Sequence, residues 1–155
     1  MTERVRPTRI FSDAQMRRYS RQILLPTVGG RGQAALLAAE VAVDVDGVGG
    51  RIAALLLAAA GVGRRVRDGA LDRRLAAADI RFPLTADDRG YTLGEAMAAL
   101  LAARNPDVTV ILARARPPTC LRIDDDGPTL PLATAFVRAG AAASALTHAL
   151  ATRAP

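Results

Sequence analysis

The feature that most constrains this chain is a strand-like segment followed at once by glycines and an apolar helical segment. Residues 40–46 (EVAVDVD) alternate apolar and polar side chains, which is the pattern of a β-strand. Residues 47–50 (GVGG) form a predicted tight turn, and residues 51–60 form a predicted apolar helix that Gly61 would end. A strand, a glycine turn and a helix in direct succession are typical of α/β folds with a parallel sheet.

Two more helices are indicated by capping boxes, in which the side chain before the helix and the side chain three residues later satisfy each other's backbone N–H groups. Ser12 with Gln15 predicts a helix to about residue 25, where Pro26 would stop it. Thr92 with Glu95 predicts a second helix, which would continue to residue 104. Both helices therefore have defined starting points in the sequence.

The other segments are less regular, and residues 64–74 show no apolar face that a second strand could bury. The patterns predict a turn at 29–32, a short helix at 33–39, a strand at 108–113, a polar connection at 114–128 and a final helix at 130–151 with a break at Gly140.

Together these elements predict a reduced Rossmann-like three-layer α/β domain with a small, mostly parallel sheet of about three strands. We expect residues 1–11 to be a flexible arm and residues 12–155 to form one domain, since 155 residues of which half are apolar can bury one core.

The composition excludes several kinds of chemistry. All 21 basic residues are arginines against 15 acidic ones, so no mechanism that needs a lysine amine is available. One cysteine (Cys120) and one histidine (His148) exclude an internal disulfide and a Cys/His zinc site. The arginines are scattered among acids without aromatic neighbours, so nucleic acid is not an expected partner. No apolar run is long enough to cross a bilayer and no secretory signal is recognisable, which predicts a cytoplasmic protein without a membrane partner.

Three blocks of sequence resemble the ThiF/MoeB/HesA family, whose members are related to ubiquitin-activating enzymes. They are residues 18–26 (RYSRQILLP) with Gly32-Gln33, residues 57–63 (LAAAGVG) and residues 105–108 (NPDV). The blocks align with almost no gaps over about two thirds of the chain, so the resemblance is to a truncated member.

The resemblance implies an ATP-dependent adenylyltransferase that uses Mg and attaches AMP to the C-terminal glycine of a ubiquitin-like sulfur-carrier protein. It also implies a dimer, in which Arg21 reaches the ATP phosphates of the partner. We therefore expect ATP and Mg as the cofactors of the family, a homodimer or a heterodimer with an intact homologue, and no zinc.

The family's glycine loop is only partly preserved. Gly47 and Gly50 match family glycines, while valines replace two others and Asp46 adds negative charge near the phosphate position. An alignment shifted by one residue gives Gly47, Gly49 and Gly50 a partial role instead. These three glycines are the candidate phosphate-binding residues.

The charged residues that the resemblance would supply are mostly replaced. The ribose-binding Asp falls on Gly69, beside the candidate Asp68, and the family's Arg falls on Ile80, beside the candidate Arg81. The catalytic Lys falls on Leu93, and the Mg-binding Asp lies in a segment that this chain lacks. Because phosphate stabilisers each contribute about 2–4 kcal/mol to catalysis, we expect turnover to be lost.

The sequence thus supports a related protein that is catalytically impaired and acts as a binding and dimerisation module. The alternative is a residual nucleotide-binding adenylyltransferase that uses Arg21, Arg81 and the 47–50 turn, and a third possibility is a decayed reading frame without a selected role. We assign no catalytic residue beyond the candidates Arg21 and Arg81.

Single residues outside these motifs have ordinary interpretations. Cys120 is expected to be an inert buried thiol, and His148 a solvated or core-edge residue. Asp44 and Asp46 share one strand face, so that face either meets solvent or is paired with arginines such as those at 64 and 67.

Overall fold

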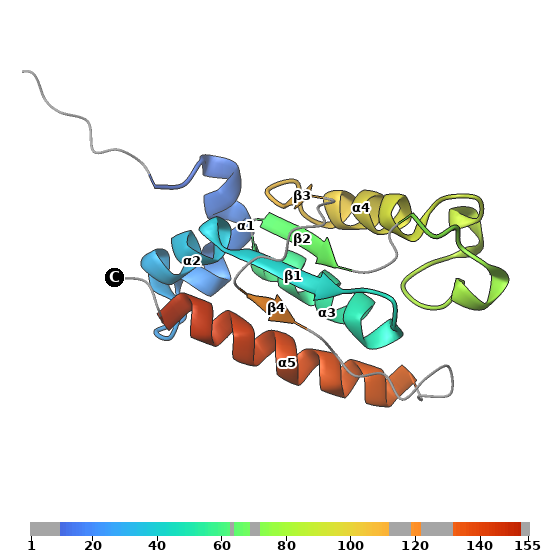
Figure 1. Cartoon of the computed structure of the whole chain (residues 1–155). Helices are drawn as coiled ribbons and strands as arrows, with labels where there is room; N and C mark the ends of the chain where they lie inside the picture. Colours follow the sequence, from blue (N-terminus) through green and yellow to red (C-terminus); the bar gives the residue numbers. More distant parts are fainter. Residues whose placement is uncertain (1–9, 63, 69–71, 112–118, 122–131, 153–155) are drawn as a thin grey trace, which may run out of the picture.

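The computed structural model describes residues 10–62, 64–68, 72–111, 119–121 and 132–152, so most of the predicted arm lies outside it. Figure 1 shows the arrangement of its elements. In chain order they are α1 (Asp13–Ile23), α2 (Gly29–Ala38), β1 (Glu40–Asp44), α3 (Val48–Ala60), β2 (Arg64–Asp68), the 3-10 turns η1 (Ala77–Asp79) and η2 (Ala86–Asp88), α4 (Leu93–Arg104), β3 (Thr109–Ile111), β4 (Cys120–Leu121) and α5 (Leu132–Thr152).

The four strands form one sheet in the order β3-β2-β1-β4, and all neighbouring pairs are parallel. This is the strand order of the Rossmann fold, in which the chain first adds strands on one side of β1 and then crosses to the other. The predicted α/β class with a small parallel sheet is therefore confirmed. The glycine turn follows β1, next to the position where the strand order reverses.

Two of the strands contradict the sequence-based prediction. β2 lies in the arginine-rich stretch that was expected to contain no strand, and it pairs with β1 from Glu40↔Arg64 to Asp44↔Asp68. β4 lies within the expected polar connection and pairs with Ala42 and Val43. Both strands are held by backbone hydrogen bonds to β1, an interaction that the apolar pattern of a sequence does not encode.

The core lies around α3, which packs against β1, α4 and α5. The predicted apolar face of β1 is confirmed, because Val41, Val43 and Val45 are all buried in this core. Helix α3 buries most of its length, and its buried residues are Gly49, Gly50, Arg51, Ile52, Ala53, Ala54, Leu57 and Ala58.

Both predicted capping boxes are present. Ser12 Oγ accepts the Gln15 N–H at 3.2 Å, and Gln15 Oε1 accepts the Ser12 N–H at 3.0 Å. In α4, Thr92 Oγ1 accepts the Glu95 N–H at 3.2 Å, and Glu95 Oε2 accepts the Thr92 N–H at 2.8 Å. These local signals correctly located the beginnings of α1 and α4.

Two glycine interpretations were wrong. The expected turn at 29–32 is the first turn of α2, where a Cβ on Gly32 would lie 3.1 Å from the Ala151 Cβ. Gly32 therefore serves the close approach of α2 and α5. Helix α5 continues through Gly140 without a break, because its buried alanines hold it against the core at a cost of about 1 kcal/mol for the glycine. No helix in the described ranges is both long and apolar enough to cross a membrane.

Candidate nucleotide site at the carboxyl edge of the sheet

The turn between β1 and α3 occupies the place where Rossmann-like folds bind ligands, at the carboxyl end of a central strand. Gly47 is the residue before α3, with extended backbone angles (φ −90°, ψ 161°), and no side chain caps the helix. Gly49 and Gly50 are buried in the first helical turn. The structure thus places all three candidate glycines at one helix N-terminus.

Gly50 has a packing role that no other residue could fill. A Cβ at this position would lie 1.7 Å from the carbonyl oxygen of Asp44 and 2.9 Å from its carbonyl carbon. The absence of a side chain therefore lets α3 contact the end of β1, which is the role of the third glycine in dinucleotide-binding turns. This observation favours the gapless alignment, in which Gly47 and Gly50 match the family.

A buried arginine, Arg51, joins this turn to the segment that follows β2. Its Nε donates to the Val45 carbonyl at 3.0 Å, and its Nη2 donates to the Asp46 carbonyl at 3.0 Å. Its Nη1 donates to the Asp79 carbonyl at 2.9 Å, and the side chain is only 3% exposed. From the sequence, Arg51 was predicted only as the first residue of an apolar helix. A charged residue in such a helix was the one sign in the sequence that it has a buried partner.

The carboxylate of Asp79 extends the same network. It accepts the Arg73 Nη1–H at 2.5 Å and the Ala76 N–H at 2.7 Å, while Arg51 Nη2 lies 3.9 Å away. The hydrogen bond from Arg73 holds the pKa of Asp79 below its usual value, and the same bond raises the pKa of Arg73. Cations near the turn are thus already paired with groups of this chain.

Acidic residues lie at the ends of both central strands. Asp44 and Asp68 are register partners at the carboxyl ends of β1 and β2, so Asp68 lies one residue before position 69, on which the resemblance places a ribose-binding Asp. Its side chain is outside the described residues. Asp46 is exposed and its N–H donates to Asp44 Oδ1 at 3.1 Å. Of the two alternatives for this strand face, solvent contact holds for Asp46, and the side chains of residues 64 and 67 are not described.

The two positions that the resemblance assigns to cations hold apolar residues, and an arginine follows one of them. Leu93 is fully buried in the core as the first residue of α4, and Ile80 is half-buried against the same core. Arg81 is exposed, and its N–H donates to the Asp79 carbonyl at 2.8 Å. The candidate Arg81 therefore lies close to the turn, while the lysine position faces the interior.

Arg21 is located at the other end of the molecule. It is exposed in the last turn of α1 and makes no hydrogen bond or ion pair with any residue in the described ranges. Its neighbour Gln22 donates to the carbonyl of Ala59 at the C-terminal end of α3. The glycine turn lies at the opposite end of this helix, about 20 Å away at 1.5 Å per residue. One chain therefore does not bring Arg21 to its own turn.

The residues that carry the family resemblance instead gather around the C-terminus of α3. Asn105 Nδ2 donates to the Ala58 carbonyl at 2.7 Å and to Tyr19 Oη at 2.8 Å. Gln33 Nε2 donates to the Ala60 carbonyl at 3.1 Å. The carbonyls of Ala58 and Ala60 at the end of α3 thus accept from side chains, and the Ala58 carbonyl also accepts the Gly61 N–H at 3.0 Å.

The same cluster depends on a glycine and a charged pair. Gly61 adopts φ +84°, and a Cβ on it would lie 2.7 Å from Tyr19 Cε1. Tyr19 Oη donates to Asp107 Oδ2 at 3.0 Å, and Arg18 forms an ion pair with the same carboxylate. Burial raises the pKa of Tyr19. We call Tyr19, Gln33, Gly61, Asn105 and Asp107 the motif cluster.

The predicted exposure was wrong for Cys120 and correct for His148. Cys120 is exposed, not buried as predicted, because β4 forms the edge of the sheet. His148 is exposed on α5, in agreement with its predicted solvated position.

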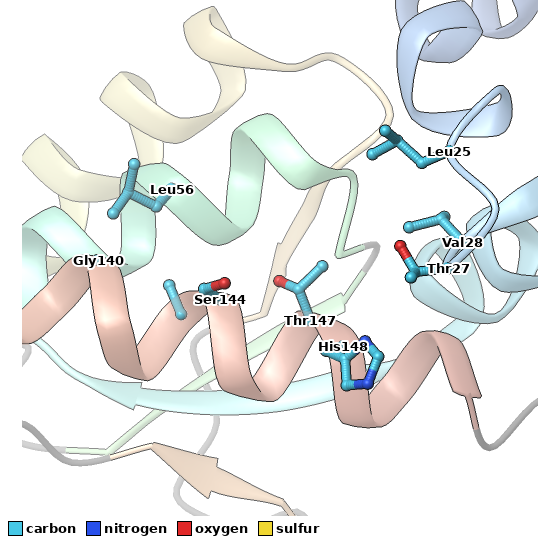
Figure 2. Close-up of a pocket in the computed structure, with 9 residues that line it drawn as sticks. Leu25, Thr27, Val28, Leu56, Gly140, Ser144, Thr147 and His148 are labelled. Atoms are coloured by element: carbon cyan, nitrogen blue, oxygen red, sulfur yellow. The ribbon is translucent and has the colours of Figure 1, made fainter.

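A hollow of about 410 Å³ lies beside His148, between α5, α3 and the segment after α1 (Figure 2). Leu25 and Val28 border it on one side and Leu56 on another, whereas α5 contributes small and polar residues. Its lining residues do not include the glycine turn. It is therefore a separate, partly apolar depression on the surface.

Two features of the carboxyl edge concern the expected ATP and Mg. No group of three or more His, Cys, Asp or Glu side chains that could hold a metal ion occurs among the described residues. The carbonyls of Val45 and Asp46 accept from Arg51, and the position for a cationic lysine is the buried Leu93. The charge of Arg51 is therefore directed at carbonyls of the turn, and the residue at the lysine position carries no charge.

No family model matches this sequence, and no curated protein shows significant sequence similarity to it. The structure is similar to the crystal structure of PaaA, with a TM-score of 0.60 and 24% identity over 76% of this chain and 38% of PaaA. It is also similar to the E. coli tRNA N6-threonylcarbamoyladenosine dehydratase TcdA, with a TM-score of 0.57 and 23% identity over 68% of this chain and 43% of TcdA.

A structure of TcdA in complex with AMP gives a TM-score of 0.57 and 22% identity over 70% of this chain and 44% of TcdA. The chain thus spans less than half the length of these proteins. At such identities the likeness establishes the fold alone, which is a Rossmann-like α/β fold.

Proposed function

We propose that this chain is a catalytically inactive relative of the ThiF/MoeB-type adenylyltransferases and that it acts by binding another protein chain. The observation that carries the proposal is Leu93, which stands where the resemblance places the catalytic lysine and is fully buried in the core. A cation cannot reach a phosphate from this position. The absence of lysine from the whole sequence excludes a replacement of the same kind.

The electrostatics of the turn support the inactive assignment. A triphosphate at the carboxyl edge would lie near the acidic residues Asp44 and Asp46, while Arg51 and Arg73 are engaged with groups of the chain itself. Each lost phosphate-stabilising group removes about 2–4 kcal/mol of transition-state stabilisation. Losing the lysine and the metal ligand together leaves no measurable adenylation.

The face around the hollow supports a role in binding. Leu24 is 82% exposed, and Leu25, Leu56 and Val137 are also exposed near the hollow or on the helix that borders it. Exposed apolar side chains that lie together are typical of protein–protein contacts. The partner we propose is a second copy of this chain or an intact homologue, to whose phosphates Arg21 would contribute in trans.

The binding half is tested by size-exclusion chromatography with light scattering, on the chain alone and mixed with candidate homologues. We expect a dimer that Leu24→Ser with Leu25→Ser dissociates. Tyr91→Ser is the matched control, because Tyr91 is exposed but belongs to the segment before α4. A chain that is monomeric alone and in every mixture contradicts the proposal.

The catalytic half is tested by calorimetric titration with ATP and Mg and by an assay for AMP release. We expect no heat of binding at millimolar ATP and no covalent adduct between a ubiquitin-like sulfur-carrier protein and AMP. Detection of either AMP release or the adduct would overturn the inactive assignment. A melt without cooperativity would instead favour a decayed reading frame.

The second candidate function is residual nucleotide binding. It is favoured by the packing of Gly50, by the location of Asp68 at the end of β2 and by the fold shared with TcdA, which has been solved with AMP. In this function Gly47 to Gly50 and Arg81 would bind the nucleotide of their own chain. Saturable heat with ATP, lost in Arg81→Ala, is the result that would favour it.

A further inference from the structure

We propose that Arg51 orders the glycine turn from within the chain, as a bound ligand would order it from outside. We call its hydrogen bonds to the carbonyls of Val45, Asp46 and Asp79 the tie. The inference deepens the proposed function and rests on it, because a turn that is ordered without nucleotide suits a chain that does not use one.

The guanidinium of Arg51 contacts the turn and η1 at the same time. Its three nitrogens each donate to a different backbone carbonyl, two in the turn and one in η1. A planar guanidinium presents fixed donors, so these three bonds together fix the turn relative to η1. A lysine ammonium is a point charge and could not reach all three carbonyls in the same arrangement.

The side chain of Arg51 is almost completely buried. A cation that is 97% shielded from water is retained only where hydrogen bonds and a nearby negative charge compensate its lost hydration. The Asp79 carboxylate, 3.9 Å from Arg51 Nη2, provides that charge. Asp79 is itself fixed by Arg73 and by the Ala76 N–H, so the tie is anchored in the segment after β2.

The carbonyl groups of the turn face Arg51. A turn that binds phosphate offers N–H groups to the ligand. Here the carbonyls of Val45 and Asp46 are oriented toward a side chain of the following helix, and Gly50 holds that helix directly against the end of β1. The turn is thus held by Arg51 on its carbonyl side and by Gly50 at its base.

The test compares Arg51→Ala and Arg51→Lys with the matched control Arg31→Ala, which removes an exposed arginine from α2. Hydrogen exchange is followed by mass spectrometry without nucleotide. In Arg51→Ala we expect peptides covering residues 45–51 and 76–80 to exchange at least about tenfold faster, while peptides of the motif cluster keep their rates. The melting temperature should fall by more than about 6 °C, and Arg51→Lys should recover less than half of that loss.

Unchanged exchange at residues 45–51 in Arg51→Ala would overturn the tie, and so would full recovery by Arg51→Lys. If Arg51→Ala does not fold, Asp79→Ala provides the second test, with faster exchange expected at residues 76–80 and at the turn. Wild-type exchange that slows at the turn only when ATP and Mg are added would also contradict the tie. Failure of the proposed function is distinct, since it is measured as AMP release and not as exchange.

Discussion

The two ends of α3 are satisfied by different kinds of residues. At the C-terminal end, Asn105, Gln33 and Gln22 donate to three successive helix carbonyls, and each of these residues belongs to a block that carries the resemblance. At the N-terminal end, Arg51 donates to the carbonyls of Val45 and Asp46 in the turn. Residues of the blocks that carry the resemblance therefore satisfy the C-terminal end of α3, whereas a residue outside these blocks satisfies the turn at its N-terminal end.

This difference separates two meanings of a family motif. In the motif cluster, Gln33 and Asn105 donate to helix carbonyls and Tyr19 donates to Asp107, so these residues join α1, α2 and α3 to the segment after α4. Charged residues of a ligand site stabilise the ligand and often cost stability in its absence. A chain can therefore resemble an enzyme most strongly at residues that take no part in the chemistry.

The largest effect is expected at the base of the glycine turn. Gly50→Ala would place a Cβ 1.7 Å from the Asp44 carbonyl oxygen, which only a shift of α3 against β1 can relieve. We expect the free energy of unfolding to fall by more than about 4 kcal/mol, or soluble protein to be lost. Urea denaturation followed by circular dichroism measures the change.

The matched control for this variant is Gly140→Ala in α5, where an added Cβ meets nothing within 4 Å. Because alanine favours a helix over glycine, we expect this variant to gain up to about 1 kcal/mol. Equal losses in both variants would show that the contact between Gly50 and β1 does not exist in solution.

A smaller effect is expected at the other end of α3. Gly61→Ala combines a left-handed backbone, at φ +84°, with a Cβ 2.7 Å from Tyr19 Cε1. We expect a loss of about 3 kcal/mol, compared with about 1 kcal/mol for Gly90→Ala, which has φ +92° but open space around its Cβ. The difference between the two variants isolates the collision with Tyr19, and equal losses would show that only backbone strain matters.

The next effect is the loss of a buried amide from the motif cluster. Asn105→Ala leaves the Ala58 carbonyl and Tyr19 Oη without their shared donor, so we expect a loss of about 2 kcal/mol in chemical denaturation. Gln22→Ala is the control, because its bond to the Ala59 carbonyl is long, at 3.3 Å, and lies near the surface. A loss no greater than that of the control would argue against the cluster as the anchor of α3.

Most of the local structure could be predicted from the sequence, including the strands β1 and β3, while the strands β2 and β4 could not. The capping boxes at Ser12 and Thr92 and the alternation along β1 are encoded by neighbouring residues, so the elements they predict were confirmed. β2 and β4 depend on backbone pairing with β1 across the chain. No local apolar pattern identifies them, and the strand order became visible only in the structure.

The candidate site was predicted in part for the same reason. The location of Gly47, Gly50 and Asp68 at the carboxyl edge follows from the strand–turn–helix pattern together with the resemblance. The role of Arg51 depends on Asp79, which is 28 residues away in the sequence and reaches the turn only through the fold. Long-range ion pairs of this kind leave no spacing signal in a single sequence.

The smallest expected effect is the pH dependence contributed by Asp79, whose pKa is lowered chiefly by the hydrogen bond from Arg73. A carboxylate with a lower pKa in the folded state stabilises the fold above its unfolded pKa, about 3.9, and loses that contribution as the pH falls through the folded value. Asp79→Asn should therefore be less stable than wild type at pH 7, and its disadvantage should shrink below about pH 4. Melting temperatures between pH 7 and pH 2.5 measure this, with Asp87→Asn as the exposed control. A disadvantage of Asp79→Asn that stays constant across this range would mean that the Arg73 pair contributes nothing to the N-terminal end of α3, and that the contrast between its two ends rests on Arg51 and Gly50 alone.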